Sequence, residues 1–476
     1  MEFLNKAFSV VQDSVSAVST AMYSYVLIIV LVLGGLYFSF RTKFVQFRCF
    51  GDQLRAVMEK PGKKGGVSSF QALMVSTASR VGTGNIIGVS TALCMGGFGS
   101  VFWMWVIALV GSASAFIEST LAQIFKKTGP EGPYGGPAYY IEAALKCRPL
   151  AAVFSVLLIV TYGVGFNMLA SYNLQSTFST YGFYNESYTP WIIGGICASL
   201  VCFCLFGGGK RIVKATSLMV PVMGVAYILV ALVIVIINFK MLPEVFGRIF
   251  SEAFDLRAIF GGFGGSCVMY GIKRGLFSNE AGVGSAPNAS ASAEVAHPAK
   301  QGLVQVLSVF IDTILVCSAT AFMCMCSGVE PTEALSGAPY VQAALTETLG
   351  VIGPVFITVS MILFAFTTLL GNLFYVDKSI CHLMKKVPSK KFMAVYYVIA
   401  SLVIFVGAGL DAGFLWDVAD ITMGLMTLVN MPVIIILGKY AYRALNDYVA
   451  KKRAGKDEAF CAKDIGIDDC DNYWNK

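Results

Sequence analysis

The sequence is short of charge for its length. Of its 476 residues only 13% are Asp, Glu, Lys or Arg, whereas 56% are hydrophobic. A soluble domain carries about twice this share of charged residues, and the mean hydropathy of +0.71 agrees with the deficit. These values exclude an ordinary soluble protein and predict one large, all-α, polytopic membrane domain.

Histidine is scarce, and cysteine pairing is missing. The chain has two histidines, His297 and His382, and none of its 13 cysteines belongs to a C-x-x-C motif. A zinc or haem site is therefore not expected, and single cysteines in apolar segments are interpreted as small packing residues. No Ser-His-Asp set, Walker loop or paired-carboxylate arrangement is present, and "GGFGG" follows no strand, so no enzyme is predicted. No basic stripe with interleaved aromatics suggests nucleic-acid binding.

Long apolar runs dominate what is present. A helix needs roughly 20 apolar residues to cross a bilayer. Eleven segments qualify: 22–40, 69–95, 99–125, 151–178, 190–207, 215–238, 257–285, 301–327, 350–375, 392–409 and 417–438. Before them, residues 3–18 put apolar side chains on one helical face. With no basic n-region to mark a signal peptide, residues 1–21 are predicted to form a helix on the membrane surface.

Lys and Arg alternate between the two sides of these segments. They crowd the loops after the first, third, fifth and ninth segments and the tail over 439–476, and they are absent from 179–189, 328–349 and 410–416. Cytoplasmic loops carry the excess of positive charge. We therefore expect a multi-pass membrane protein with its N-terminus outside and its C-terminus and tail in the cytoplasm.

Two of the segments are interrupted. "RVGTGNIIG" lies in the second, and a glycine-rich run from Phe260 to Ala293 interrupts the seventh. Each interrupted segment opens a block of five, over 69–238 and 257–438, and 22–40 is left as an extra N-terminal helix. Broken helices at matching positions of two halves indicate a transporter built from inverted repeats. The alternative for each break is a close helix crossing mediated by glycine.

Unwinding a helix releases backbone groups that lipid cannot satisfy. Freed carbonyls can bind Na⁺ or an ammonium group, and the N–H groups of a half-helix suit a carboxylate. Thr83 and Asn85 add hydrogen-bonding side chains without adding charge. The first break is therefore a candidate site for a zwitterionic amino acid.

The runs "GTGNIIGVSTALCMGGFGSVFWMW", "GGPAYYI", "GIKRGLFSNEAGVGSAP", "DTILVCSATA" and "FAFTTLLG" resemble the alanine or glycine:cation symporter family. The resemblance implies a five-plus-five inverted repeat of the leucine-transporter type. It also implies secondary transport of a small neutral amino acid, usually with Na⁺ as the coupling ion, across the inner or plasma membrane.

The resemblance also implies a site. Thr83, Gly84 and Asn85 would bind the carboxylate and amino group of the substrate, and the middle of the seventh segment around Gly265–Gly271 would complete the pocket. Candidate residues there are Gly265, Cys267, Tyr270 and Gly271. A Na⁺ site between the second and ninth segments would use the carbonyls of Ala78 and Val81 and the hydroxyls of Thr367 and Thr368. Each hydroxyl could instead bond back to its own helix.

The chain departs from the family at two places. "TTLLGN" has Asn372 where the family usually has Trp, and Leu169 and Ser171 stand where it typically has Gln and Asn. An asparagine leaves more room and offers a hydrogen-bonding edge. We therefore expect a substrate other than plain alanine, larger or more polar, such as glutamine.

Ionisable residues at membrane depth are functional candidates. Arg80 precedes the first break and either takes part in a gate or pairs with an acid. Arg274 and Glu280 would need a break between them to meet, and Asn279 and Glu280 either form a structural corner or carry function. Glu118, Glu280 or Asp312 could carry a proton if H⁺ is the coupling ion.

The sequence thus predicts a symporter that couples Na⁺ entry to uptake of a small neutral amino acid by alternating access. An H⁺-coupled or uncoupled carrier is the alternative. The expected partners are the amino-acid substrate and the lipid bilayer, and nothing in the sequence indicates an oligomeric state.

Overall fold

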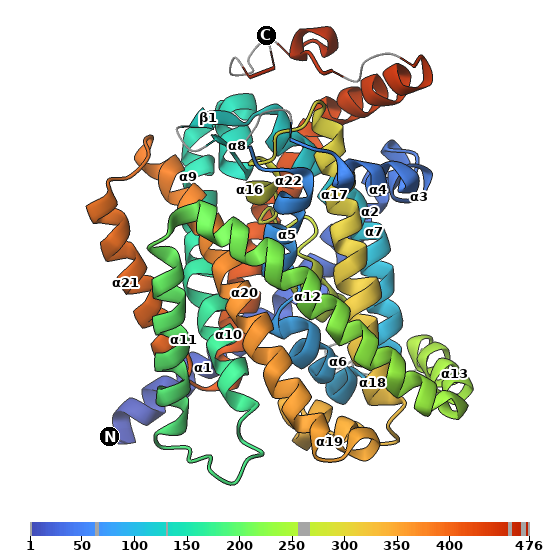
Figure 1. Cartoon of the computed structure of the whole chain (residues 1–476), viewed down its shortest axis with the longest axis vertical. Coiled ribbons are helices and arrows are strands. Elements are labelled where there is room, and N and C mark those ends of the chain that lie inside the picture. Colours follow the sequence, from blue (N-terminus) through green and yellow to red (C-terminus); the bar gives the residue numbers. More distant parts are fainter. Residues whose placement is uncertain are drawn as a thin grey trace.

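The structure is a computed structural model of the 476-residue chain. It describes residues 2–61, 66–129, 132–255, 267–455, 459–467 and 473–474, with side chains from residue 11 onward. Helices make up nearly all of it, and most run along the long axis of the molecule (Figure 1).

Within the described part of the chain, eight helices are long and apolar enough to cross a membrane. Five are single elements: α7 (Gly99–Ile124), α12 (Gly208–Ile237), α20 (Ile352–Met384), α21 (Lys390–Gly407) and α22 (Ala412–Arg453). Three are composites with a π-helical stretch inside: α1 (Glu2–Ala21), η1 (Met22–Leu27) and α2 (Ile28–Arg41); α9 (Arg148–Leu158), η3 (Ile159–Gly165) and α10 (Phe166–Ser176); and α17 (Pro298–Val309), η6 (Phe310–Cys317) and α18 (Ser318–Met325). The apolar helix α11 (Thr189–Leu205) is shorter. These nine helices coincide with nine of the eleven expected segments, and π-helical turns often mark functional sites.

Short elements cover the two ends of the bundle (Figure 1). One end carries α3 (Val45–Arg48), α4 (Phe50–Met58), the hairpin β1 (Lys127–Gly129) and β2 (Gly132–Tyr134), α8 (Pro137–Leu145) and the tail with η8 (Ala462–Ile465). The hairpin is antiparallel, with Thr128 opposite Pro133. The other end carries η4 (Phe239–Met241), α13 (Leu242–Ala253), η7 (Glu333–Leu335) and α19 (Ala338–Leu349). We call the first end the basic face, because the loops rich in Lys and Arg lie there.

The second expected segment is broken, as predicted. It consists of α5 (Ser69–Arg80), an irregular stretch over 81–83, the π-helical turn η2 (Gly84–Gly88) and α6 (Val89–Gly96). A capping box between Ser68 and Gln71 begins α5, which satisfies N–H groups that the first turn of a helix leaves free. The chain therefore enters the bundle from the basic face as a regular helix and unwinds inside it.

The break in the seventh segment lies later than expected. α15 runs unbroken from Cys267 to Asn279, so the predicted break around Gly265–Gly271 is wrong for its described part, and Gly265 lies outside the described residues. The helix ends where Glu280, Gly282 and Gly284 take φ values of 53°, 87° and 91°. Left-handed backbone stops an α-helix, and glycine adopts it without strain. After this stretch comes the single turn α16 (Pro287–Ser290).

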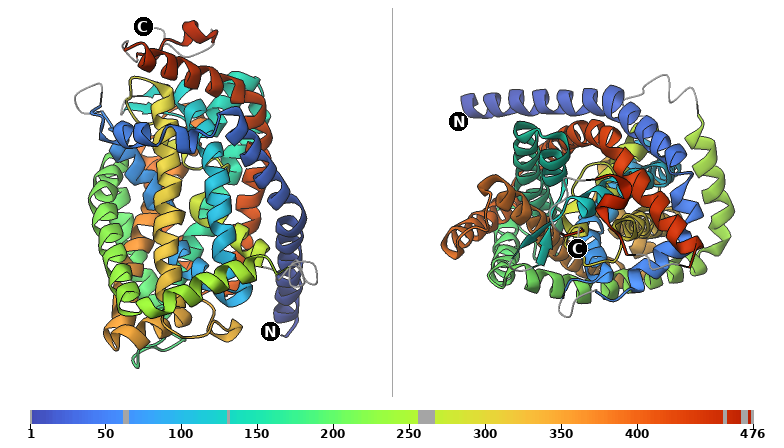
Figure 2. Two further views of the ribbon diagram at one scale, coloured as in Figure 1. Left: turned by 90° about the vertical axis from the view of Figure 1, so that its right-hand side faces the viewer. Right: turned by 90° about the horizontal axis from the view of Figure 1, so that it is seen from above.

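The N-terminal helix differs in direction from the others. Seen from above, it extends along the edge of the bundle instead of along its long axis (Figure 2). α1 continues into η1 without leaving helical backbone angles. A surface position for residues 1–21 therefore stays a prediction.

Candidate substrate and cation site

Asn85 holds the first break open. Its Oδ1 accepts a hydrogen bond from the Gly82 amide (2.8 Å). In an unbroken helix that amide would donate to the Ala78 carbonyl, so the Asn85 side chain takes the place of a helical bond. The Asn85 amide in turn donates to Gly82 (3.2 Å) and not to Val81. The carbonyls of Ala78 and Val81 therefore do not receive the hydrogen bonds from Gly82 and Asn85 that an unbroken α-helix would give them.

The amide group of Asn85 also joins three helices. Its Nδ2 donates to Asp312 Oδ1 (2.7 Å) and to Ser278 Oγ (3.0 Å). The other carboxylate oxygen of Asp312 accepts from Ser278 (2.6 Å) and Thr313 (2.8 Å). Asp312 is fully buried and lies in the π-helical stretch η6. A carboxylate is therefore bonded directly to the unwound segment.

Of the two threonines proposed for the cation, one has a free hydroxyl. Thr367 donates back to the carbonyls of Leu363 (2.9 Å) and Phe364 (3.1 Å). The Thr368 hydroxyl is buried and has no hydrogen-bond partner, and a Cβ added to Gly82 would collide with it. An unpaired buried hydroxyl is costly unless a ligand satisfies it. Hard oxygen atoms suit Na⁺, and of the two threonines Thr368 is the one whose unpaired hydroxyl lies at Gly82.

The close crossing of α20 and α5 places Thr368 at Gly82. A Cβ on Gly371 would lie 2.7 Å from the backbone nitrogen of Ser79, closer than side chains normally approach. Thr368 lies one turn earlier on α20 and meets Gly82 just beyond the end of α5. A glycine-mediated crossing and an unwound segment therefore occur together here and are not alternatives.

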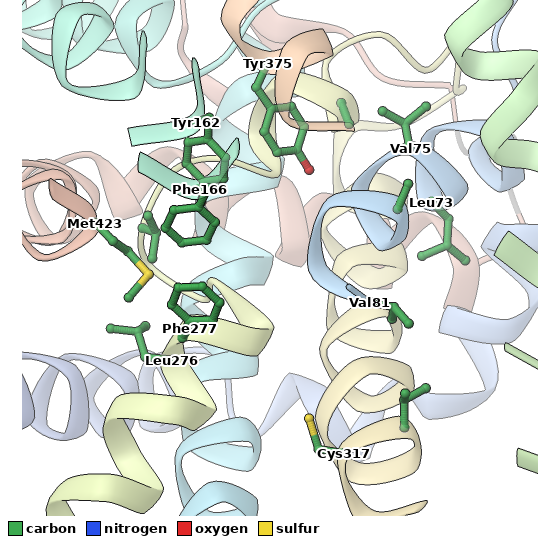
Figure 3. Close-up of a cluster of buried hydrophobic side chains, with 14 of the residues drawn as sticks. Leu73, Val75, Val81, Tyr162, Phe166, Leu276, Phe277, Cys317, Tyr375 and Met423 are labelled. Atoms are coloured by element: carbon green, nitrogen blue, oxygen red, sulfur yellow. The ribbon is translucent and has the colours of Figure 1, made fainter. Parts of the chain in front are cut away.

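An aromatic column lies against the unwound segment. The rings of Phe166 and Phe277 stack with centroids 4.5 Å apart. Tyr162 packs on one side of the pair (4.9 Å) and Trp416 on the other (4.8 Å); Figure 3 shows Tyr162, Phe166 and Phe277 in succession. A Cβ on Gly84 would lie 2.8 Å from the Phe277 ring. Glycine therefore allows the backbone to approach this ring closely.

The polar residues of α10 differ from those expected. Leu169 and Ser171 are buried, and the Ser171 hydroxyl has no hydrogen-bond partner. The side chain that reaches the first break is Asn173, whose Nδ2 donates to the Thr83 hydroxyl (3.1 Å). Sequence reasoning missed Asn173, although it lies in the run "YGVGFNMLASYN" that was compared with the family.

The carboxamide of Asn372 is hydrogen-bonded to other residues of the protein. Its Oδ1 accepts from Ser79 (2.7 Å), and its Nδ2 donates to Asn167 Oδ1 (3.0 Å). Ser79 also approaches Glu280 Oε1 (3.4 Å). Asn372 thus ties α20 to α5 and α10, and the hydrogen-bonding edge expected for the substrate is engaged in this structure.

The other candidates from the seventh segment pack away from the breaks. A Cβ on Gly271 would collide with the Ser100 carbonyl of α7, so this position has no space for a side chain. The Tyr270 side chain approaches Gly96 at the end of α6. Cys267 lies near the Glu252 carbonyl (3.4 Å). Tyr270, Gly271 and Cys267 therefore line helix contacts, because the backbone unwinds only after Asn279.

Asn279 and Glu280 form the corner at the second break. Asn279 Oδ1 accepts from the Ala281 amide (3.0 Å), and Glu280 accepts from the Ser285 hydroxyl (2.6 Å).

Arg80 is buried and donates to Gln305 (3.0 Å), while its Nε and Nη2 have no hydrogen-bond partner. Among the described residues Arg80 forms no ion pair, so the expected pairing with an acid is absent. Arg80 instead lies between the two breaks as an incompletely paired cation.

Arg274 pairs with an acid that the sequence analysis did not select. Its Nη1 lies 3.3 Å from Asp420, and the Lys273 amine lies 2.8 Å from the same carboxylate. All three side chains are at most 8% exposed, and the guanidinium lies 4.1 Å from the centre of the Trp416 ring. Arg274 therefore does not meet Glu280. Applying the rule on intramembrane charges to the last segment would have found Asp420.

Comparison with known proteins shows to which family the chain belongs. The chain matches the sodium:alanine symporter family over residues 8–462. It is 42% identical over 447 residues to the amino-acid carrier protein AlsT of Bacillus subtilis, with 94% of each chain covered. It is 40% identical over 453 residues to the probable sodium/glutamine symporter GlnT of the same organism, covering 95% of this chain and 93% of that one. A sodium/proton-dependent alanine carrier protein of Bacillus sp. PS3 is 35% identical over 441 residues, covering 88% and 96%.

Solved structures extend the likeness to the fold. The crystal structure of MhsT in complex with L-phenylalanine aligns with a TM-score of 0.54 at 16% identity, covering 84% of this chain and 93% of that one. A Na⁺-coupled sialic acid symporter aligns with a TM-score of 0.50 at 14% identity, covering 92% of each chain. The fold is that of the leucine-transporter type, with a broken helix opening each repeat. The chain belongs to the sodium:alanine symporter family and is a multi-pass membrane transporter of amino acids, not an enzyme.

Proposed function

We propose that this protein couples the entry of Na⁺ to the uptake of a small neutral amino acid. The observation that carries the proposal is the buried, unpaired Thr368 hydroxyl at Gly82, beside the stretch where the carbonyls of Ala78 and Val81 do not receive their usual α-helical hydrogen bonds. Uncharged oxygens suit a hard monovalent cation, and we assign these three groups to Na⁺. Thr83, Gly84 and Asn85, one turn further along, are the groups proposed to bind the substrate.

The unwound segment would couple the two ligands mechanically. The proposed Na⁺ ligands and the proposed substrate ligands are neighbours in one short stretch, residues 78–85. Binding of the ion would hold Gly82 against α20, which orders the backbone that receives the substrate. Such ordering lowers the cost of binding the second ligand and gives positive cooperativity.

The basic face is proposed to be cytoplasmic. Cytoplasmic loops concentrate Lys and Arg, and α5 and the C-terminal end of α22 both lie at this face. A Na⁺ gradient directed inward would then drive uptake from the opposite end, where α13 and α19 lie.

Uptake by the purified protein in proteoliposomes tests the coupling. Radiolabelled alanine or glutamine should accumulate when an inward Na⁺ gradient is imposed, and accumulation should collapse when the gradient is dissipated. Liposomes without protein are the control. Uptake that ignores both Na⁺ and H⁺ gradients would contradict symport.

The substrate is proposed to be larger or more polar than alanine. Asn372 occupies the place where the family usually has Trp, and its carboxamide could exchange its bond to Asn167 for one to a substrate. GlnT, described as a probable sodium/glutamine symporter, is among the relatives.

We expect unlabelled glutamine to compete for labelled substrate at least as well as alanine. Changing Asn372→Trp should weaken glutamine competition by about 10-fold or more, since lost pocket volume discriminates by roughly this amount, and should spare alanine. A clear preference of the unmodified protein for alanine would contradict the proposal on substrate size.

A second candidate, coupling to H⁺, rests on Asp312. This buried carboxylate contacts the unwound segment through Asn85 and forms no ion pair among the described residues. Changing Asp312→Asn should abolish uptake driven by a proton gradient while leaving Na⁺-driven uptake measurable, if the carboxyl group carries the proton. If the Asp312→Asn variant keeps both types of uptake, Asp312 has no part in the mechanism.

A further inference from the structure

The end of the chain returns to the basic face and docks there. Residues 459–467 and 473–474 lie over the ends of the helices in Figures 1 and 2. The Trp474 indole is 6% exposed, and its Nε1 donates to the Gln123 carbonyl at the end of α7 (2.8 Å). The Phe460 amide donates to the Ala296 carbonyl (3.1 Å). The tail is thus bonded to two separate parts of the membrane domain.

The receiving surface is built for aromatic rings. The Lys126 amine is 1% exposed and lies 3.9 Å from the centre of the Tyr473 ring and 4.7 Å from that of Trp474. A desolvated ammonium on an aromatic face is stabilising. On the other side the Phe460 ring packs against His297 (4.9 Å) and Trp474 (5.3 Å). Burial lowers the pKa of His297 to about 4, so its ring is neutral at physiological pH.

Helix α22 also holds the tail, through two side chains. Lys451 donates to the Ala459 carbonyl (2.8 Å) and Arg443 to the Ile465 carbonyl (3.2 Å), both from α22. Within the tail, the Ala462 amide donates to the Trp474 carbonyl (3.3 Å), so the two described parts of the tail are bonded to each other.

The docked tail lies on the connection between the two broken helices. Gln123, which accepts from Trp474, donates through its own Nε2 to the carbonyls of Ser290 in α16 and Ala293 just after it. The next residue, Glu294, donates its amide to Val67 (2.9 Å), directly before α5. One continuous set of hydrogen bonds therefore joins Trp474 to the basic-face ends of α16 and α5.

We propose that Gln123, Lys126, Ala293 and Ala296 form a docking site for an aromatic peptide, occupied by the chain's own tail, and that its occupancy restrains transport. Rocking of one part of the bundle against the other exposes the substrate site alternately to the two sides. Opening toward the basic face would separate α5 from the α16–α17 connection. The tail opposes that separation, because it stabilises the groups that hold the two together. The inference about rate rests on the proposed function, whereas the docking itself does not.

The test removes the anchor in the full-length protein. With Trp474→Ala we expect amide hydrogen exchange over residues 66–80 and 286–297 to rise by about 10-fold and the initial uptake rate by roughly fivefold, typical of coupling between two sites. Lys463→Ala is the matched control, since Lys463 is an exposed tail residue. Trp474→Phe keeps a ring and loses the donor, so its exchange should fall between the two.

A peptide added in trans separates docking from loss of folding. A synthetic peptide of residues 459–476 should restore slow exchange and slow uptake to the Trp474→Ala protein, and the same peptide carrying alanine at position 474 should not. Unchanged exchange in α5 and after α16, in a variant whose tail exchanges freely, would overturn the proposal. Altered exchange without Na⁺-driven uptake in any variant would leave the docking intact and count against the proposed function.

Discussion

Changing Thr368→Ala is expected to raise the Na⁺ concentration for half-maximal uptake by about 10- to 100-fold. The hydroxyl is buried and unpaired in the protein and faces Gly82, where two backbone carbonyls are released. A polar contact to a charged group contributes about 1.5–3 kcal/mol, and each 1.4 kcal/mol is a factor of ten in affinity. The Na⁺ dependence of initial uptake in proteoliposomes measures the shift.

The neighbouring threonine supplies the control. Thr367 bonds back to Leu363 and Phe364 on its own helix, so Thr367→Ala should leave the Na⁺ dependence within about twofold, because that bond is local and weak. Equal effects of the two substitutions would place the ion elsewhere. A Thr368→Ser variant keeps the hydroxyl and should retain most of the affinity for Na⁺.

Changing Asp420→Asn is expected to lower the free energy of unfolding by about 3–5 kcal/mol, the usual result of removing one partner of a buried ion pair. Asp420 is fully buried and is the shared partner of Lys273 (2.8 Å) and Arg274 (3.3 Å). Without it, two buried cations face each other with no carboxylate. Thermal unfolding of the purified protein in lipid nanodiscs measures the loss as a lower transition temperature.

Two variants sharpen this second prediction. Asp417→Asn removes an equal charge one turn away, at a half-buried position outside any described ion pair, and should change the transition temperature little. Combining Asp420→Asn with Lys273→Gln leaves one buried cation, Arg274, against the Trp416 ring. It should recover part of the stability. Equal stability of Asp420→Asn and the unmodified protein would show that the pair is not desolvated in the membrane.

The membrane class, nine helices and the first break were predictable from the sequence, because hydropathy and glycine act locally. The second break shows the limit. Both the run around Gly265–Gly271 and the run after Asn279 contain glycines. Of the glycines in them that the structure describes, only Gly282 and Gly284 adopt left-handed backbone, and Gly271 serves the contact with α7. Glycine composition cannot tell a turn from a close crossing, since both need the absence of a side chain.

Some residues of the candidate site were likewise predictable from the sequence, and others were not. Thr83, Asn85 and the carbonyls of Ala78 and Val81 lie in one short stretch, so the sequence alone could select them. Thr367 and Thr368 are adjacent and chemically identical, and only the rotation of α20 decides which hydroxyl meets Gly82. Asp420 could be recognised as an intramembrane acid, but its partners lie about 146 positions earlier in the chain.

The sequence by itself determined that this is a membrane protein, that one of its helices is interrupted at residues 81–83, and that uncharged oxygen atoms lie at this interruption. These features depend on local composition. Tertiary structure decided which hydroxyl faces the released carbonyls, which acid neutralises Arg274, and that the aromatic tail returns to the ends of the broken helices. Each of these depends on distances between residues far apart in the chain. Such distances follow from how the helices pack, and the pattern of residues along any one helix does not contain them.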